Sequence, residues 1–102
     1  MTKVTTINTL VLKPEHLEDY IALQREFTST ISALPNGPVG GRLYRSAQGT
    51  RIVLVSQFDS LAAQSATMSS PALAAHIAKL RPFVESASPD LYEEAFTYGH
   101  FR

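Results

Sequence analysis

Two polar side chains stand in stretches otherwise typical of buried structure, and they are the strongest candidates for chemistry. Asn8 lies in VTTINTLVL, among β-formers, and a buried amide needs hydrogen-bond partners. His76 lies in ALAAHI, where the alanines leave room beside its ring. An amide can stabilise a developing oxyanion, and an imidazole can accept a proton near neutral pH. We therefore expect Asn8 and His76 to be catalytic; the alternatives are an amide satisfied by backbone or water and a helix-edge histidine in contact with solvent.

Aromatic side chains recur along the chain and could line an apolar pocket for a small molecule. The residues that we expect to bind such a ligand are Tyr20, Phe27, Tyr44, Leu54, Phe58 and Phe83. The same side chains would serve equally well as a hydrophobic core, which is the commoner use of aromatic stripes. The pattern leaves open which face of a sheet Tyr44 and Arg42 occupy.

Other kinds of site find no support in the residue types. The sequence has no cysteine, which excludes thiol chemistry and agrees with a reducing compartment. No two of the three histidines, at positions 16, 76 and 100, have metal-ligand spacing. The serines at 60, 65, 69 and 70 lack a nucleophile elbow and are typical of caps and turns. We therefore expect neither a metal nor another cofactor.

Composition narrows the possible partners. The 102 residues predict one domain, 1–102, and the nine basic and nine acidic residues are scattered singly. Without a basic stripe, nucleic acid is not an expected partner. The first twelve residues have a threonine-rich strand pattern and no apolar run of membrane-spanning length. We expect a cytoplasmic protein with no membrane contact.

The elements follow from hydrophobic periodicity and from proline and glycine. Strand patterns cover 4–13, the stretch after Gly40, and 52–58, while three- and four-residue spacing predicts a helix over 14–34. A loop over 46–50 joins the middle strands, with Gly49 expected at positive φ. Helices are predicted at 61–68 and from Pro71 to about Ser86, then a turn at 88–90 and a strand over 91–101. The order β-α-β-β-α-β predicts an α+β, ferredoxin-like fold with a four-stranded antiparallel sheet and helices on one face.

The first and third predicted strands carry apolar residues at both parities, so both sheet faces need burial. We expect one set to face the helices: Leu10, Leu12, Ile52, Leu54 and Phe58. The other set would pack against a second copy of the chain: Ile7, Val11, Val53 and Val55. Burial of a Val or Ile contributes about 1.5–3 kcal/mol, so a homodimer through the sheet face is predicted.

Four segments in this order and spacing resemble the antibiotic biosynthesis monooxygenase family of dimeric α+β barrels. They are INTLVLKPEHLEDYIALQREF, GGRLYRS, RIVLVSQFDSLAA and SSPALAAHI, and they span nearly the whole chain. The resemblance implies a dimeric barrel and, for the cofactor-free oxygenases, an asparagine on the first strand, which Asn8 matches. It also implies a tryptophan where Phe58 stands and, in some members, a second asparagine where Leu54 stands.

Three functions follow from this resemblance. The first is cofactor-independent monooxygenation of a small aromatic substrate, such as a quinol, phenol or anthrone, with O₂. The second is non-catalytic binding of a small apolar molecule by a dimer, favoured by Phe58 and Leu54. The third is haem degradation, for which Asn8 and His76 match but Thr67 stands where that branch has a tryptophan. The resemblance ranks oxygenation of a phenolic substrate above haem degradation.

Overall fold

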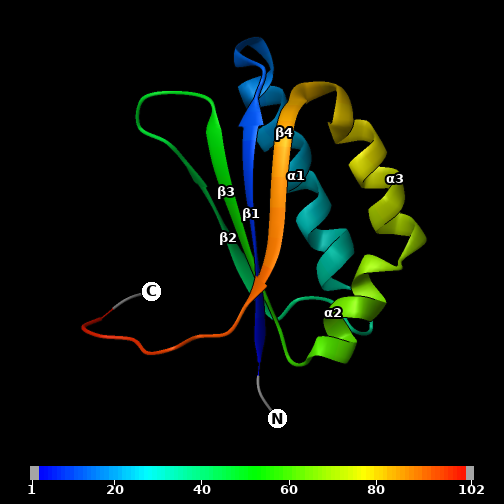
Figure 1. Cartoon of the computed structure of the whole chain (residues 1–102). Helices are drawn as coiled ribbons and strands as arrows, with labels where there is room; N and C mark the ends of the chain where they lie inside the picture. Colours follow the sequence, from blue (N-terminus) through cyan, green and yellow to red (C-terminus); the bar gives the residue numbers. More distant parts are fainter. Residues whose placement is uncertain (1–2, 101–102) are drawn as a thin grey trace.

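The computed structural model describes residues 3–100, which form one antiparallel sheet with a layer of helices on one face (Figure 1). The sheet order is β2-β3-β1-β4, with every neighbouring pair antiparallel. The elements in chain order are β1 (Val4–Leu12), a 3₁₀ turn (Pro14–His16), α1 (Leu17–Ser32), β2 (Gly40–Arg45), β3 (Arg51–Phe58), α2 (Leu61–Met68), α3 (Pro71–Leu80), a second 3₁₀ turn (Arg81–Phe83) and β4 (Val84–Tyr92). This confirms the α+β, ferredoxin-like fold class. Within the described residues, no helix combines the length and the apolarity needed to span a membrane.

In the central strands β1 and β3, even- and odd-numbered residues face opposite sides of the sheet, as the sequence pattern predicts. Leu10 pairs with Ile52 in the β1–β3 ladder, and both are buried in a core with Leu12 and Leu80. Phe58, opposite Val4 at the end of the ladder, is only 1% exposed. Side chains alternate between the faces of a sheet, so the even-numbered residues of β1 and β3 lie under the helices. Their odd-numbered neighbours therefore point to the other face.

The last helix and the last strand differ from the prediction. We predicted a helix to about Ser86, a turn at 88–90 and a strand over 91–101, whereas α3 ends at Leu80 and β4 runs from Val84 to Tyr92. Pro82 lacks the N–H that would continue the helix, and β-branched Val84 favours a strand. Pro89, which suggested a turn, is tolerated because β4 is an edge strand. Residues 93–100 leave the sheet, and Phe101 lies outside the described residues.

The β2–β3 connector also closes differently. We expected Gly49 at positive φ, but Gly99, at 64°, is where the described residues place a positive-φ glycine. The connector 46–50 closes instead on an ordinary backbone bond, in which the Ser46 N–H donates to the Arg51 carbonyl at 2.9 Å. A connector of this length can reverse the chain without a left-handed residue. The expectation for Gly49 was therefore wrong.

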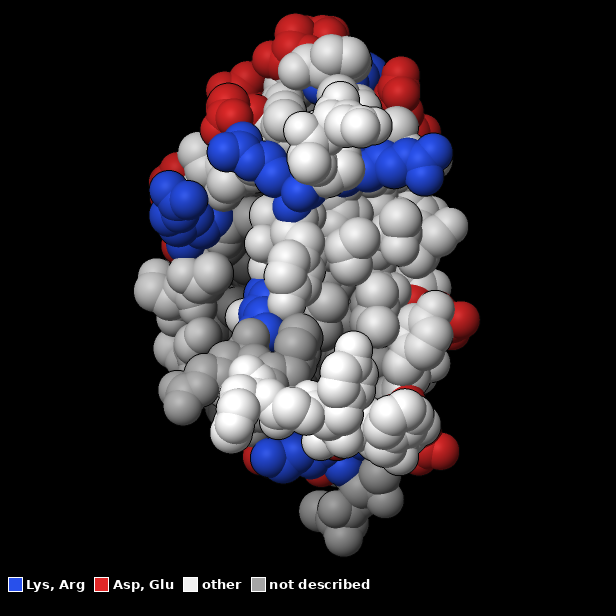
Figure 2. All heavy atoms as spheres, turned by 90° about the vertical axis from the view of Figure 1, so that its left-hand side faces the viewer, with Lys and Arg blue, Asp and Glu red and all other residues white. Residues whose placement is uncertain are grey.

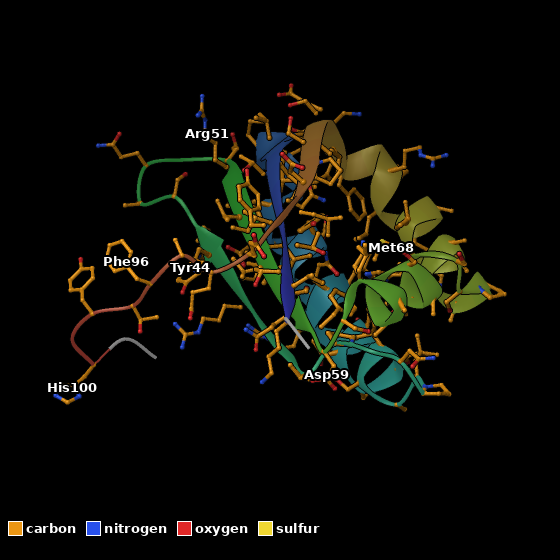
Figure 3. All side chains as sticks on the ribbon, turned by 60° about the horizontal axis from the view of Figure 1, so that its bottom comes forward. Tyr44, Arg51, Asp59, Met68, Phe96 and His100 are labelled. Atoms are coloured by element: carbon orange, nitrogen blue, oxygen red, sulfur yellow. The ribbon has the colours of Figure 1, made fainter. Side chains whose placement is uncertain are left out.

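The sheet face away from the helices is open, and its centre carries few charged side chains (Figure 2). A hollow of about 570 Å³ lies on this face, bordered by Ile7, Tyr44, Val55 and Tyr92 among others. The segment after β4 extends away from the sheet on the same side, carrying Phe96, as Figures 1 and 3 show. The aromatic side chains of this segment are strongly exposed, Phe96 at 78% and Tyr98 at 84%. Apolar surface of this kind is typical of an interaction site.

Candidate functional site

A cleft of about 440 Å³ lies between α1 and the strands β2 and β3, on the helix-covered side of the sheet. One stripe of α1 forms its outer wall, because residues three and four apart share a helix face. The α1 residues are Glu18, Ile21, Gln24, Arg25, Phe27, Thr28 and Ile31, and the strand side includes Gly41, Leu43, Leu54 and Ser56. The wall is largely apolar, with polar groups at Gln24, Thr28 and Ser56 and charged side chains at Glu18, Arg25, Arg42 and Arg45. Such a lining suits a small ligand with an apolar body and few polar groups.

The structure brings only part of the predicted binding set to this cleft. Phe27 and Leu54 line it. Tyr20 and Phe58, each 1% exposed, lie in the core instead. Phe83 packs against the core at the far end of the sheet, with its ring 4.8 Å from that of His16. Tyr44 lies on the open face of the sheet, beside the other hollow (Figure 3).

His76 lies behind the cleft wall and is connected to it through Gln24. Its Nε2 is 2.8 Å from Gln24 Oε1, and Gln24 Nε2 donates to the Tyr20 hydroxyl at 2.8 Å. The Phe27 ring stacks on the imidazole, with centroids 3.9 Å apart and planes 10° from parallel. Gln24 and Phe27 both border the cleft, whereas His76 is 7% exposed. A ligand in the cleft would therefore meet Gln24 before it met the histidine.

Gln24 is the functional candidate that the sequence pattern missed. It lies within the helix predicted over 14–34, four residues after Tyr20 and three before Phe27, at the spacing of the apolar repeat. The available signal was its type: an amide in an apolar stripe, four residues after Tyr20, is placed to hydrogen-bond on the same helix face. What the sequence could not show is that α3 brings His76 to the same amide across 52 residues.

The environment of this chain keeps His76 neutral. Burial lowers the pKa of His76 from its ordinary 6.5, and the nearby Lys79 charge lowers it further. Burial raises the pKa of Tyr20, and the hydrogen bond from Gln24 opposes that rise. Since Gln24 Oε1 accepts, the His76 proton lies on Nε2 in this arrangement. Nδ1 then holds the lone pair that can take up a proton.

The lowered pKa predicts acid sensitivity of the fold. The unfolded chain takes up a proton at His76 near pH 6.5, the folded chain only at a lower pH. The contribution of His76 to stability is thus complete above pH 6.5 and is lost as the pH falls toward the folded-state pKa. Urea unfolding between pH 5 and 8 should show stability falling below that point in the wild type, and falling less in His76→Gln. An equal acid-side loss in both proteins would contradict the assignment.

Asn8 lies on the helix side of β1, where its neighbours in the ladders are Leu54 and Pro89. Its Oδ1 is buried and has no hydrogen-bond partner within the described residues, and the same is true of Thr6 Oγ1. Buried polar atoms are normally paired, so two unpaired acceptors on one face are unusual. Both are one strand away from the cleft, since their β3 neighbours Leu54 and Ser56 form its wall. Asn8 itself does not border the cleft.

Comparison with known proteins identifies the fold. No protein-family profile matches the sequence, and no curated protein sequence does. Among solved structures, SnoaB, a cofactor-independent oxygenase from Streptomyces nogalater, is 18% identical with a TM-score of 0.80, over 98% of this chain and 100% of that one. A mutant of SnoaB superposes with a TM-score of 0.86 at 15% identity over the same shares.

Two further structures agree. Rv0793 from Mycobacterium tuberculosis is 18% identical with a TM-score of 0.80, over 96% of this chain and 100% of the other. A protein described as an antibiotic biosynthesis monooxygenase is 14% identical with a TM-score of 0.78, over 90% and 98%. These matches extend over nearly the whole of each chain. The protein therefore has the fold of the antibiotic biosynthesis monooxygenase structures, as the sequence resemblance implied.

Proposed function

We propose that the protein is a cofactor-independent monooxygenase that oxidises a small aromatic substrate, a phenol, quinol or anthrone, with O₂. The observation that carries the proposal is the cleft itself. It is largely apolar, and its α1 wall carries Gln24 and Phe27, which both contact His76. A planar ring would fit between apolar walls with its acidic group near a hydrogen-bonded imidazole. The shared fold with SnoaB supports the same proposal.

In the proposed reaction the substrate first loses a proton. A neutral His76 takes it up at Nδ1, while Gln24, which borders the cleft and accepts from the Nε2–H, holds the imidazole in this orientation. The resulting electron-rich anion transfers one electron to O₂, and the radical and superoxide then combine to form a peroxide. For an anthrone CH₂ group, loss of water from that peroxide leaves a carbonyl. One oxygen atom therefore remains on the ring carbon and the other leaves as water.

Asn8 would act from behind Leu54. The side-chain amide offers an acceptor on one side and two donors on the other. Its unpaired Oδ1 can accept the hydrogen of a ligand hydroxyl, and rotation of the amide would present the NH₂ group to the anion. Leu54, the ladder partner of Asn8, forms part of the cleft wall, so access to Asn8 would require the Leu54 side chain to move. Tyr20 would orient Gln24.

The proposed partners are the aromatic substrate and a second copy of the chain. The open sheet face presents Ile7, Val53 and Val55, each only partly buried, and the protruding segment presents Phe96 and Tyr98. Packing two such faces together would bury both sets. A dimeric α+β barrel results, with one cleft per chain. We place the protein in the cytoplasm.

Non-catalytic binding by the same dimer is the second candidate. The observation that favours it is that Asn8 and His76 both lie behind the cleft wall rather than on it. Haem degradation has less support, because Thr67 stands where a bulky ring would be needed. Its side chain is 2% exposed and its hydroxyl donates to the Asn36 carbonyl at 2.7 Å. Titration with haem should give no Soret shift.

Oxygen uptake with an anthrone separates catalysis from binding. We expect the wild type to consume O₂, and Gln24→Leu and His76→Gln each to lower the rate about 100-fold or more, the usual effect of losing general-base assistance. Because the pKa of His76 is lowered, the acid limb of the rate profile should have its midpoint below pH 6.5.

His16→Gln is the matched control, since His16 does not border the cleft and this variant should keep the wild-type rate. Tight anthrone binding without O₂ uptake would favour the binding protein and exclude the oxygenase. Asn8→Ala should also slow the reaction; an unchanged rate would remove Asn8 from the mechanism.

A further inference from the structure

We propose that the cleft takes an aromatic ligand that carries a carboxylate, and that Arg25 binds this carboxylate at the mouth. The inference rests on the proposed function and adds the charge and the orientation of the substrate. It follows from the charged residues that border the cleft. They are Glu18, Arg25, Arg42 and Arg45.

The first pair closes one end of the mouth. Arg45 on β2 donates from Nη1 to Glu18 Oε2 on α1 at 2.6 Å. Arg45 thus links the helix to the strand at the protein surface. The Arg45 side chain is 54% exposed and the Glu18 side chain 77%, so both charges remain solvated in the ion pair. Its charges cancel, and neither residue is left to attract an anion.

Arg42 and Arg25 lie on different elements and differ in their contacts. Arg42 Nη1 donates to the Tyr44 hydroxyl at 3.2 Å, and Tyr44 lies on the open face of the sheet. Arg25 follows Glu18 by two helical turns on the same stripe of α1. Within residues 3–100 no carboxylate forms an ion pair with it. Arg25 is therefore the cation at the mouth best placed to receive a ligand anion.

The cleft interior dictates which end of the ligand enters. Ile21, Phe27, Leu43 and Leu54 make the inner part apolar, and a carboxylate placed there would lose its hydration without gaining a cation. The carboxylate must therefore stay at the mouth, where a guanidinium offers a planar pair of donors. The ring then lies inside, toward Gln24. This orientation brings the oxidisable carbon to the His76 side.

Binding of two matched compounds tests the inference. The probes are 3-hydroxy-2-naphthoate and its primary amide, which share a ring and a hydroxyl and differ in charge. By calorimetry at low salt we expect the carboxylate to bind roughly threefold to tenfold more tightly, with the preference reduced by added salt. Arg25→Gln should abolish the preference and Arg25→Lys should restore part of it. Glu18→Gln should strengthen carboxylate binding, because Arg45 is then released.

Arg51→Gln is the matched control, since it makes the same charge change at the hairpin end of β3, outside the cleft lining (Figure 3). It should leave the preference intact. Equal affinity for the two probes, or equal effects of Arg25→Gln and Arg51→Gln, would overturn the inference. O₂ uptake with a neutral anthrone reports on the proposed function separately. Uptake that persists in Arg25→Gln, with no carboxylate preference in the wild type, would leave the oxygenase standing and reject the anion site.

Discussion

Replacement of Phe58 by alanine is expected to lower the free energy of unfolding by about 3–5 kcal/mol, as is typical for a large aromatic removed from a packed core. Phe58 is 1% exposed and lies at the end of the β1–β3 ladder, opposite Val4. It does not border the cleft, although the sequence suggested a ligand contact there. The change should therefore appear in urea unfolding curves, with ligand affinity altered little in the protein that remains folded.

Leu54→Ala is the matched comparison for Phe58→Ala. Leu54 lies four residues before Phe58 on β3 and on the same face of the sheet. Leu54 is only partly buried and forms the cleft wall. We expect a smaller stability loss than for Phe58→Ala and a larger change in anthrone affinity. The reverse ranking, with Phe58→Ala weakening binding while the fold is unaffected, would place Phe58 at the site after all.

Val53→Asp is expected to convert the proposed dimer to a monomer. Val53 is in the centre of the open sheet face, opposite Thr9 on β1 and Tyr44 on β2. An aspartate there would bring a charge into an apolar interface without a partner, which costs several kcal/mol. Light scattering after gel filtration at about 10 µM, well above the Kd expected of a stable interface, should give twice the chain mass for the wild type and one chain mass for the variant.

Ala62→Asp is the control for this change. Ala62 is exposed on α2, on the opposite side of the molecule from the open face, so its variant should keep the dimer mass. A wild-type protein that already runs at the mass of one chain would reject the sheet-face dimer. A Val53→Asp protein that stays dimeric would place the interface elsewhere.

The alternation of apolar residues in the strands and their three- and four-residue spacing in the helices were enough to predict most of the helices and strands and the buried face of the sheet. Leu10, Leu12 and Ile52 share one parity, and the structure buries all of them under the helices. The short helix at 61–68 has the predicted bounds, and the Ser60 hydroxyl caps it by accepting from the Ala63 N–H at 3.1 Å. These features depend on neighbours in sequence or on the period of the pattern. Local reasoning therefore suffices for them.

The last strand and the cleft depend on position in the whole fold. Pro89 is typical of a turn unless it is known that the strand lies at the edge of the sheet, and only the topology shows this. Likewise, Gln24 becomes a candidate because α3 places His76 against it. Tyr44 could not be assigned to a face by parity alone, and the structure places it opposite to the cleft. Each of these three features depends on contacts between residues far apart in the sequence.

The cleft and the hollow on the open sheet face share a border at the start of β2. Gly40, Gly41 and Arg42 border both the cleft and the hollow on the open face. A Cβ at Gly41 would lie 2.6 Å from the Val55 carbonyl oxygen, so a side chain at this position would collide with the β3 backbone. In the proposed dimer, occupation of the cleft and association of two chains would act on the same segment of backbone. Ligand affinity and dimer affinity would then be thermodynamically linked, each changing the other by the same factor.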